Sequence, residues 1–446
     1  MTEAGRQRSE GRQKTFLFSR FSPTLCSLLS VLCIFSSGAA FAAGGTLRLP
    51  DLIREVENNY DVLSSKARAL ASTYRIPQAQ SLQDPMLMFG YQNEGWNKYT
   101  YGKMQGAQWM FSASQLFPFP GKRGLRGKAA AEDAAGLGAQ SNAVRLQTIA
   151  RVKELYYDLF FTYKSIDLIK DRTALFSKIE DAALARYSSG LAPQQEVLMA
   201  QTEKYMLLER EEMLRQKIQS AEAMLNSALG RDVASPLGRP VEPPPTAYVR
   251  EMSEAINLAY ENSPQLRSRE KIISSAEARV KLAQKDYYPD FTVAAGVFKR
   301  AGEFEDMWSL TTTVNIPLFY RTKQRQAVHE AEASLSETHQ ELEGAKSLIA
   351  SSVRDNYSIL QSAGKLMELY KKGLIPKTYQ DFESALSGYM TGKVEAITTI
   401  SRLKAILDFE TSYWGQFAER EKAIARLEAL TGISDSPAGE GSHEKK

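Results

Sequence analysis

Two short stretches of the sequence, ALARYSSGLA (183–192) and ALSGYMTGKV (385–394), read almost alike although they lie 202 residues apart. In each, Ala-Leu is followed by a tyrosine and, three residues later, by a glycine. These residues are Tyr187, Gly190, Tyr389 and Gly392. Both stretches follow long segments with helical spacing of apolar residues, and glycine supplies the left-handed conformation that commonly ends a helix. Each stretch is therefore predicted to be the tip of a hairpin of two helices.

The likeness extends beyond the tips. The segment QWMFSASQLFP (108–118) aligns with MWSLTTTVNIP (307–317), which places Trp109 on Trp308. The segment that begins ENNYDVLSS at Glu57 resembles the one that begins ENSPQLRS at Glu261. A period of about 200 residues is far longer than a solenoid repeat of about 20–50 residues. The sequence therefore predicts a duplicated half-molecule.

The domain organisation follows from this duplication and from the composition of the segments around it. Arginines and a lysine precede an apolar run and an Ala-Phe-Ala pattern that ends at Ala42, as in a cleaved export signal. The prolines of residues 238–248 cannot continue a helix and suit a linker. The predicted parts are an export signal (1–42), a first repeat (43–237), a linker (238–248), a second repeat (249–432) and a disordered polar tail (433–446).

Composition excludes several classes of function. Removal of residues 1–42 takes away five of the 56 basic and two of the 52 acidic residues, so the mature chain is nearly neutral and nothing in it predicts nucleic-acid binding. Both cysteines, Cys26 and Cys33, lie in the predicted signal, so no disulfide or thiolate site is expected. They lack the small-residue pattern of a lipoprotein signal, and no lipid anchor is predicted. No later segment has the length of apolar sequence that a transmembrane helix needs.

The same order of elements is expected in each repeat. A helix (46–83 and 249–286) precedes two strands and a very long helical stretch (121–187 and 323–389), and a last helix closes the second repeat (393–430). Apolar residues in the first long stretch are three and four apart, which indicates a coiled-coil seam. They are Ile149, Val152, Tyr156, Leu159, Tyr163 and Ile166. A helix of this length would extend about 100 Å.

Strict alternation of apolar and polar residues predicts the strands. In MWSLTTTVNI, Trp308 and Leu310 share one face and the polar side chains share the other. The residues predicted for the polar faces include Met86, Met88, Met110, Ser309, Thr311 and Thr313. Such strands fit either a soluble sheet or a membrane barrel with a lipid-facing and a water-facing side. Four strands cannot close a barrel and open sheet edges do not occur in lipid, so membrane strands would require oligomers, with three chains giving twelve strands.

Together, the duplication, the strand pairs between long helices, RYSSGLAPQQEVLMAQ (186–201) and QLFPFPGKR (115–123) resemble the TolC family of outer-membrane efflux proteins over residues 46–432. The resemblance implies a mainly α-helical fold with a membrane β-barrel. It implies a homotrimer whose twelve-stranded barrel in outer-membrane lipid continues into an α-helical barrel that crosses the periplasm. Its partners would be a periplasmic adaptor (membrane fusion) protein and an inner-membrane efflux pump.

The resemblance also implies that the hairpin tips form the periplasmic entrance and adaptor contact, through Tyr187, Gly190, Glu196, Tyr389, Gly392, Lys393 and Glu395. Glu196 and Glu395 lie near helix starts, where a carboxylate favours the helix dipole. In the family the second tip carries a gate held by polar and charged contacts. Its basic position falls on Val394, beside Lys393, and its usual aspartates fall on Thr398 and Ser401. Our hypothesis is that Lys393 pairs with Glu196 of a neighbouring hairpin.

Catalytic and cofactor motifs are not evident. GKRGLRGKAA (121–130) resembles a phosphate loop, but Lys122 and Ala129 occupy positions that require Gly and Ser/Thr. His329 and His339 are ten residues apart, which places them on different faces of a helix. No catalytic site, cofactor or metal site is predicted, and the protein is expected not to be an enzyme. An alternative of another class is a periplasmic coiled-coil adaptor.

The substrate is predicted by resemblance. APQQEVLMAQ (192–201) and FPFPGKR (117–123) resemble the heavy-metal branch of the family. Methionine thioethers suit soft ions such as Cu(I), and Met86, Met88 and Met110 would face the lumen. Methionine also fills space without binding metal. A multidrug duct and a type I protein-secretion duct are the alternatives within this class.

Overall fold

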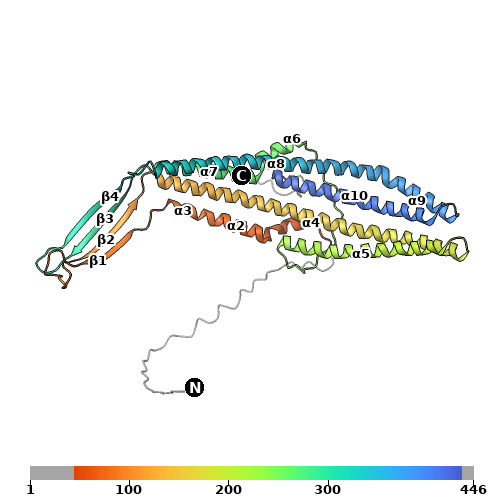
Figure 1. Ribbon diagram of the computed structural model, residues 1–446, viewed down its shortest axis with the longest axis horizontal. Coiled ribbons are helices and arrows are strands. Elements are labelled where there is room, and N and C mark those ends of the chain that lie inside the picture. The colour runs from red at the N-terminus through yellow and green to blue at the C-terminus, as the bar shows by residue number, and fades with distance from the viewer. Residues whose placement is uncertain (1–44, 434–446) are drawn as a thin grey trace, which may run out of the picture. The chain divides into compact units, whose positions relative to one another are not determined.

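The computed structural model describes residues 45–433. The predicted export signal and the tail from residue 434 onward lie outside the described residues. Within them, a four-stranded antiparallel sheet lies at one end of a helical bundle, and two helical hairpins turn at the other end (Figure 1). The sheet and the hairpin tips are therefore separated by the length of the helices.

The elements of the first half are α1 (Leu49–Glu55), the 3₁₀ turn η1 (Val56–Asn58), α2 (Tyr60–Thr73), α3 (Arg75–Gln80), β1 (Met86–Gln92), β2 (Gln108–Phe117), α4 (Lys122–Ser188) and α5 (Gln194–Leu229). Those of the second half are α6 (Met252–Asn262), α7 (Pro264–Lys285), β3 (Asp290–Lys299), β4 (Met307–Asn315), α8 (Gln324–Leu369), the π turn η2 (Tyr370–Leu374), α9 (Ile375–Met390) and α10 (Ala396–Thr431).

The predicted long helix is present as α4, which has 67 residues. No proline interrupts it, and small residues in its first half let α7 pack closely against it. The Ser268 hydroxyl donates a hydrogen bond to the Gly136 carbonyl at 2.9 Å, and Ser275 donates to the Ala129 carbonyl at 3.1 Å. These bonds join two helices that are more than a hundred residues apart in sequence.

The first helix of each repeat is broken, so the prediction of continuous helices over 46–83 and 249–286 was wrong. Asn59 separates η1 from α2, and its side chain accepts hydrogen bonds from the backbone N–H groups of Asp61 and Val62. This is an N-cap, which favours a new helix start. In the second half, Pro264 occupies the first turn of α7, where a missing N–H costs nothing.

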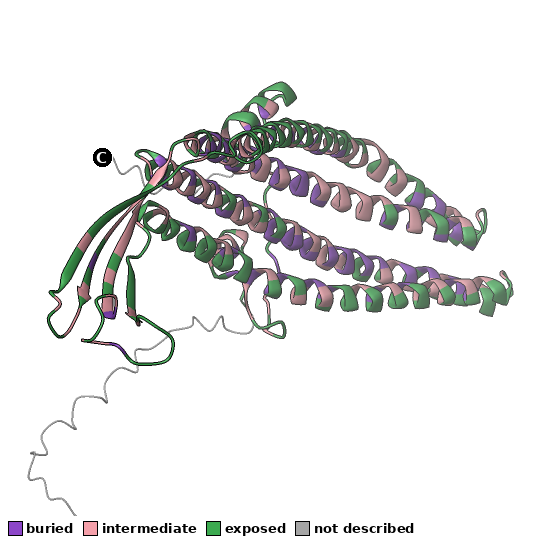
Figure 2. Ribbon diagram, turned by 60° about the vertical axis from the view of Figure 1, so that its left-hand side comes forward, coloured by how far each residue is buried: buried purple, intermediate pink, exposed green. Residues whose placement is uncertain are grey.

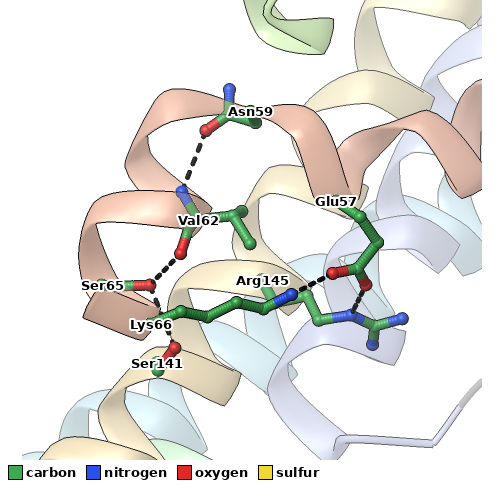
Figure 3. A network of polar contacts seen from close by, with 7 residues as sticks. All are labelled: Glu57, Asn59, Val62, Ser65, Lys66, Ser141 and Arg145. Atoms are coloured by element: carbon green, nitrogen blue, oxygen red, sulfur yellow. Dashed lines mark hydrogen bonds and ion pairs between the residues drawn. The ribbon is translucent and has the colours of Figure 1, made fainter. Parts of the chain in front are cut away.

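Figure 3 shows how the start of α2 is attached to α4. The hydroxyls of Ser65 and Ser141 are 3.1 Å apart, and Glu57 bridges Lys66 and Arg145. The two cations lower the pKa of the Glu57 carboxyl through their hydrogen bonds. The network fixes the position of the broken first helix along α4.

The second long helix also departs from the prediction of one continuous stretch over 323–389. It contains the π turn η2, in which the Ile375 N–H donates to the Tyr370 carbonyl, five residues back. Proline at 376 has no N–H to donate and clashes with a regular preceding turn. The wider π turn directly before it accommodates this residue.

Buried positions lie on the facing sides of the helices (Figure 2), and most of them carry apolar side chains that form clusters. One cluster joins α4 and α5 to α9 and α10, and its members Phe176, Ile179 and Leu403 are fully buried. Ion pairs continue along α4 and α10. The pairs are Lys153–Glu428, Glu154–Arg426, Asp158–Lys422 and Arg172–Glu410. The two halves of the chain are thus held together by both apolar and charged contacts.

The sheet has the order β1-β2-β3-β4, with each neighbouring pair antiparallel. The four predicted strands are therefore present within residues 45–433. The predicted linker has no helix, and its Val241 N–H donates to the Leu47 carbonyl at 3.1 Å. The linker is tied in this way to the start of the described chain.

Candidate functional site

The strand register places the predicted polar-face residues together. Met86 is paired with Ser114, Met88 with Ser112, and Gly90 with Met110, and paired residues point to the same side of a sheet. The same face continues across β3 to Ser309, Thr311 and Thr313. All six residues predicted for the lumen thus share one face of one sheet.

The opposite face is apolar and exposed. It carries Phe89, Phe111, Val297, Trp308 and Leu310 in adjacent positions. Phe89 is 66% exposed, Trp308 80% and Leu310 65%. Contiguous apolar surface of this kind marks contact with another protein or with a membrane.

A fourth methionine joins the polar face, and sequence reasoning missed it. Met307 is paired with Phe298, which in turn is paired with Met110, so Met307 lies on the same face and at the same level of the sheet as Met110. The Sδ atom of Met307 lies 2.8 Å from the Arg300 guanidinium. Its position two residues before Ser309 could have revealed it, since residues two apart share a face.

Both predicted tips end their helices in the same way. The Gly190 N–H donates to the Tyr187 carbonyl at 2.9 Å, and the next N–H donates to the Arg186 carbonyl at 2.8 Å. The second tip repeats this pattern, from Gly392 to Tyr389 at 3.1 Å and from the next residue to the carbonyl at 388 at 2.8 Å. The two glycines have φ of 71° and 76°. The prediction of glycine in the left-handed C′ position is confirmed.

We expect Gly190→Ala to lower the free energy of unfolding by about 1–2 kcal/mol, because alanine resists the left-handed conformation. No atom lies within 4 Å of the added Cβ, so the cost is conformational. Gly138→Ala is the matched control, since this glycine lies inside α4 and also has open space around it. The control should raise stability by about 0.5–1 kcal/mol. Urea denaturation measures the free energy of unfolding of both variants, and an equal change in the two would refute this explanation.

The remaining tip residues lie near helix starts. Pro193 is the N-cap of α5, and Glu196 lies in its first turn. Glu395 is the N-cap of α10, although its side chain makes no capping hydrogen bond. Lys393 is exposed and donates its backbone N–H to the Gly388 carbonyl. The pairing of Lys393 with Glu196 of a neighbouring hairpin stays a prediction.

Within the chain, Glu196 contacts a different residue of the second tip. The Tyr389 hydroxyl donates a hydrogen bond to the Glu196 carboxylate at 2.9 Å. Tyr389 is fully buried between the two hairpins, whereas Tyr187 is 44% exposed. The structure thus brings Tyr389 and Glu196 together and leaves Tyr187 at the surface.

Arg186 completes this contact, and sequence reasoning missed it. Its guanidinium lies 4.8 Å from the centre of the Tyr389 ring and donates a hydrogen bond to the Tyr389 carbonyl. A cation over an aromatic face is attracted by the ring. Arg186 lies in the last turn of α4, within the first tip motif, but only the folded chain shows that Tyr389 is its partner. We call Arg186, Glu196 and Tyr389 the tip contact.

Burial and the hydrogen bond to Glu196 raise the pKa of Tyr389 to about 12, from an ordinary value of 10.0. A raised pKa means that the folded state favours the neutral phenol. The stability that this phenol contributes to the fold is therefore fully present at a pH below its ordinary pKa, and it is lost as the pH rises through the pKa of the folded state. We expect the tip contact to persist from neutral pH to about pH 10. Ultraviolet titration should show the Tyr389 phenolate forming above pH 11; a step in the wild type near the ordinary pKa, absent from Tyr389→Phe, would contradict this.

None of the helices in residues 45–433 is both long and apolar enough to cross a membrane. In the same residues, no three His, Asp or Glu side chains are grouped as a metal site would need. The candidate functional regions of the described chain are therefore the two-faced sheet and the tip contact.

Residues 53–231 and 255–432 match the family model described as outer membrane efflux protein. VceC, an outer membrane protein of Vibrio cholerae, superposes with a TM-score of 0.74 at 17% identity over 87% of this chain and 97% of that chain. CusC, described in terms of transmembrane channel formation, superposes with a TM-score of 0.77 at 13% identity over 88% and 94%. The CmeC outer membrane channel of Campylobacter jejuni gives 0.70 at 12% identity over 87% of both chains. No curated protein matches the chain in sequence.

Proposed function

Because the chain belongs to the outer membrane efflux protein family, we propose that it is the exit duct of a tripartite efflux system. Three copies would pass substrates without chemistry from the periplasm to the exterior. An inner-membrane pump would supply the energy, and a periplasmic adaptor would join the pump to the helical tips. The family predicted from the sequence is confirmed, and the outer membrane is its location.

One observation carries this proposal. A sheet with one apolar exposed face is continuous, through Gly121 and Asp290, with helices that end in two hairpin tips. The buried Lys122 ammonium lies 2.8 Å from Asp290 and 3.1 Å from Asp286, which joins helix and strand rigidly at this boundary. Lipid would cover the apolar face, and the helices would bridge the periplasm.

The surface of the single chain supports the predicted trimer. Strands β1 and β4 each have one strand neighbour in the described chain, so both outer edges of the sheet are open. An open edge cannot remain in lipid, and pairing between copies removes it. Along α2 and at its C-cap Tyr74, four large apolar residues are exposed at spacings of three, seven and four: Tyr60, Leu63, Leu70 and Tyr74. This stripe is a coiled-coil face that a helix of a second copy would cover.

Fractionation of cells that express the full chain tests the location and the assembly. We expect the protein in the outer-membrane fraction, and chemical cross-linking in detergent should give a trimer. Recovery as a soluble periplasmic monomer would instead favour the coiled-coil adaptor.

Within this duct, we propose that the tip contact holds the periplasmic entrance narrow. Tyr389 and Glu196 come from different hairpins, and their separation would let the hairpins move apart. Glycines 190 and 392 turn the chain at the tips, and the exposed Lys393 and Glu395 are available to an adaptor.

The methionines favour soft metal ions as substrates. Met86, Met88, Met110 and Met307 lie on the face that the proposed barrel would turn inward. The Met110 methyl group lies 3.3 Å from the Cβ position of Gly90, so its side chain extends over β1, the strand that carries Met86 and Met88. Thioethers are ligands for Cu(I), and neighbouring ones could pass such an ion along without tight binding.

Growth of a deletion strain on copper, silver, zinc, cobalt, cadmium, dyes and detergents tests the substrate. We expect sensitivity to copper and silver, restored by the wild-type gene. A variant with leucine at all four methionine positions keeps the apolar volume and should restore less. Sensitivity to dyes and detergents with normal metal tolerance would show a multidrug duct, with the methionines as packing residues.

A further inference from the structure

The end of the sheet farthest from the helices carries a half-buried cation that no carboxylate neutralises (Figure 1). At this end, residues 93–107 join β1 to β2, and residues 300–306 join β3 to β4. Arg300 begins the second of these loops. In the part of the chain that the structure describes, its guanidinium forms no ion pair, whereas the neighbouring Lys299 is paired with Asp306 at 2.6 Å. The charge of Arg300 is therefore uncompensated there.

Two neutral side chains hold this guanidinium on the polar face of the sheet. Its Nε donates a hydrogen bond to the Gln108 Oε1 atom at 3.2 Å, and its Nη2 lies 2.8 Å from the Met307 Sδ atom. Gln108 lies two residues before Met110 in β2 and therefore shares its face. Met307 is on the same face in β4. The guanidinium thus contacts both neighbours of β3 on the face that the proposed barrel would turn inward.

Backbone contacts also fix the position of this arginine. The Arg300 N–H donates to the Asp306 carboxylate at 3.0 Å, which ties the last residue of the loop to the first. The Tyr101 hydroxyl donates to the Arg300 carbonyl at 3.3 Å, which attaches the arginine to the loop between β1 and β2. Arg300 is held both at its backbone and at its guanidinium, so its charge has a defined place.

The level of the sheet next to this charge is apolar. Phe298 is paired with Met110 on one side and with Met307 on the other, so three large apolar residues lie side by side on the polar face. They separate Arg300 from the serines and threonines farther along that face. A charge acts more strongly on a passing ion where apolar groups replace part of the water around it.

We propose that Arg300 of three copies forms a ring of positive charge at the outer end of the duct, which favours anions over small cations in the lumen. The inference rests on the proposed function, which assembles three copies and turns the polar face inward. Rings of charged side chains concentrate ions of opposite charge in a passage and exclude ions of like charge. The ring slows the leakage of cations inward from the exterior, and the pump drives exported cations past it.

Reversal potentials across planar lipid bilayers with a potassium chloride gradient test this ring, since they measure the permeability of chloride relative to potassium. Arg300→Gln should lower this ratio by roughly twofold at about 0.1 M salt, and by more in dilute salt, where screening is weaker. Arg300→Lys keeps the charge and should keep the ratio of the wild type. Lys299→Gln is the matched control: it removes one positive charge from the adjacent residue, which is paired with Trp109 on the apolar face, and should leave the ratio unchanged.

Two results of these recordings would overturn the proposal. One is a permeability ratio in Arg300→Gln that equals the wild-type ratio at every salt concentration. The other is an equal shift of the ratio in Arg300→Gln and Lys299→Gln, because the effect would then not depend on the face that carries the charge. Absence of current from every form, wild type included, would refute the duct function itself.

Chemical modification of the inserted protein gives an independent measurement that does not depend on how a variant folds. The thiol of Arg300→Cys attacks a methanethiosulfonate reagent, forms a disulfide with its charged group and releases methanesulfinate. The natural cysteines, Cys26 and Cys33, lie in the predicted export signal. A trimethylammonium-ethyl reagent should raise the permeability of chloride relative to potassium, and a sulfonato-ethyl reagent should lower it. Equal ratios after the two reagents, or a thiol that neither reagent reaches, would contradict a place in the lumen for this side chain.

Discussion

Glu410→Leu should lower the free energy of unfolding by about 3 kcal/mol, near the lower end of the range for a broken buried ion pair. The Arg172 guanidinium is held between α4 and α10, with its Nε 3.0 Å from the Glu410 carboxylate and its Nη1 2.6 Å from the Tyr379 hydroxyl. The side chains of Arg172 and Glu410 are only 11% and 15% exposed. Without the Glu410 carboxylate, the desolvated Arg172 cation keeps only the Tyr379 hydroxyl of these two hydrogen-bond partners.

Urea denaturation in detergent measures this effect. The double variant Arg172→Met with Glu410→Leu removes both charges and should recover most of the lost stability. Glu368→Gln is the control, because its pair with Lys372 lies at the surface and its removal should cause no measurable change. A double variant as unstable as Glu410→Leu would show that the charge of Arg172 is not the cause.

Tyr389→Phe should raise the ion current through the assembled duct several-fold. The substitution keeps the buried ring beneath the Arg186 guanidinium and removes only the hydroxyl that donates to Glu196. A hydrogen bond to a charged group contributes about 1.5–3 kcal/mol, and a trimer would lose three of them. The entrance should therefore populate its wider state more often.

Tyr187→Phe is the control for this prediction, since Tyr187 is its counterpart in the first tip and is exposed. Single-channel recording in planar bilayers measures both variants. Glu196→Gln should also raise the current, because a neutral acceptor is weaker than a carboxylate. Equal currents in Tyr389→Phe and Tyr187→Phe would contradict a gating role for the tip contact.

Local patterns in the sequence predicted most elements of the fold. The two-residue period identified the four strands and their faces, and the glycines marked both hairpin tips because few other residues adopt the left-handed conformation. The break before α2 was missed, although Asn59 is a common N-cap residue. The π turn was missed as well, although proline at 376 signals a disturbance of the helix.

Contacts between the halves could not be predicted in the same way. Arg186 reaches Tyr389, 203 residues away, and the choice of this partner depends on how the two hairpins pack. The registers of β2 with β3 and of β3 with β4 likewise decide that Met307 lies level with Met110 across the sheet. Periodicity assigns a residue to a face of its own element, whereas its partner across elements depends on the tertiary arrangement.

Reconstitution of the purified chain in planar lipid bilayers tests whether the protein is a trimeric duct that is narrowed by the tip contact. We expect a trimer that inserts and carries a stepwise ion current, with larger steps for Tyr389→Phe than for the wild type. A well-folded protein that stays monomeric and carries no current in the wild type or in Tyr389→Phe would contradict it.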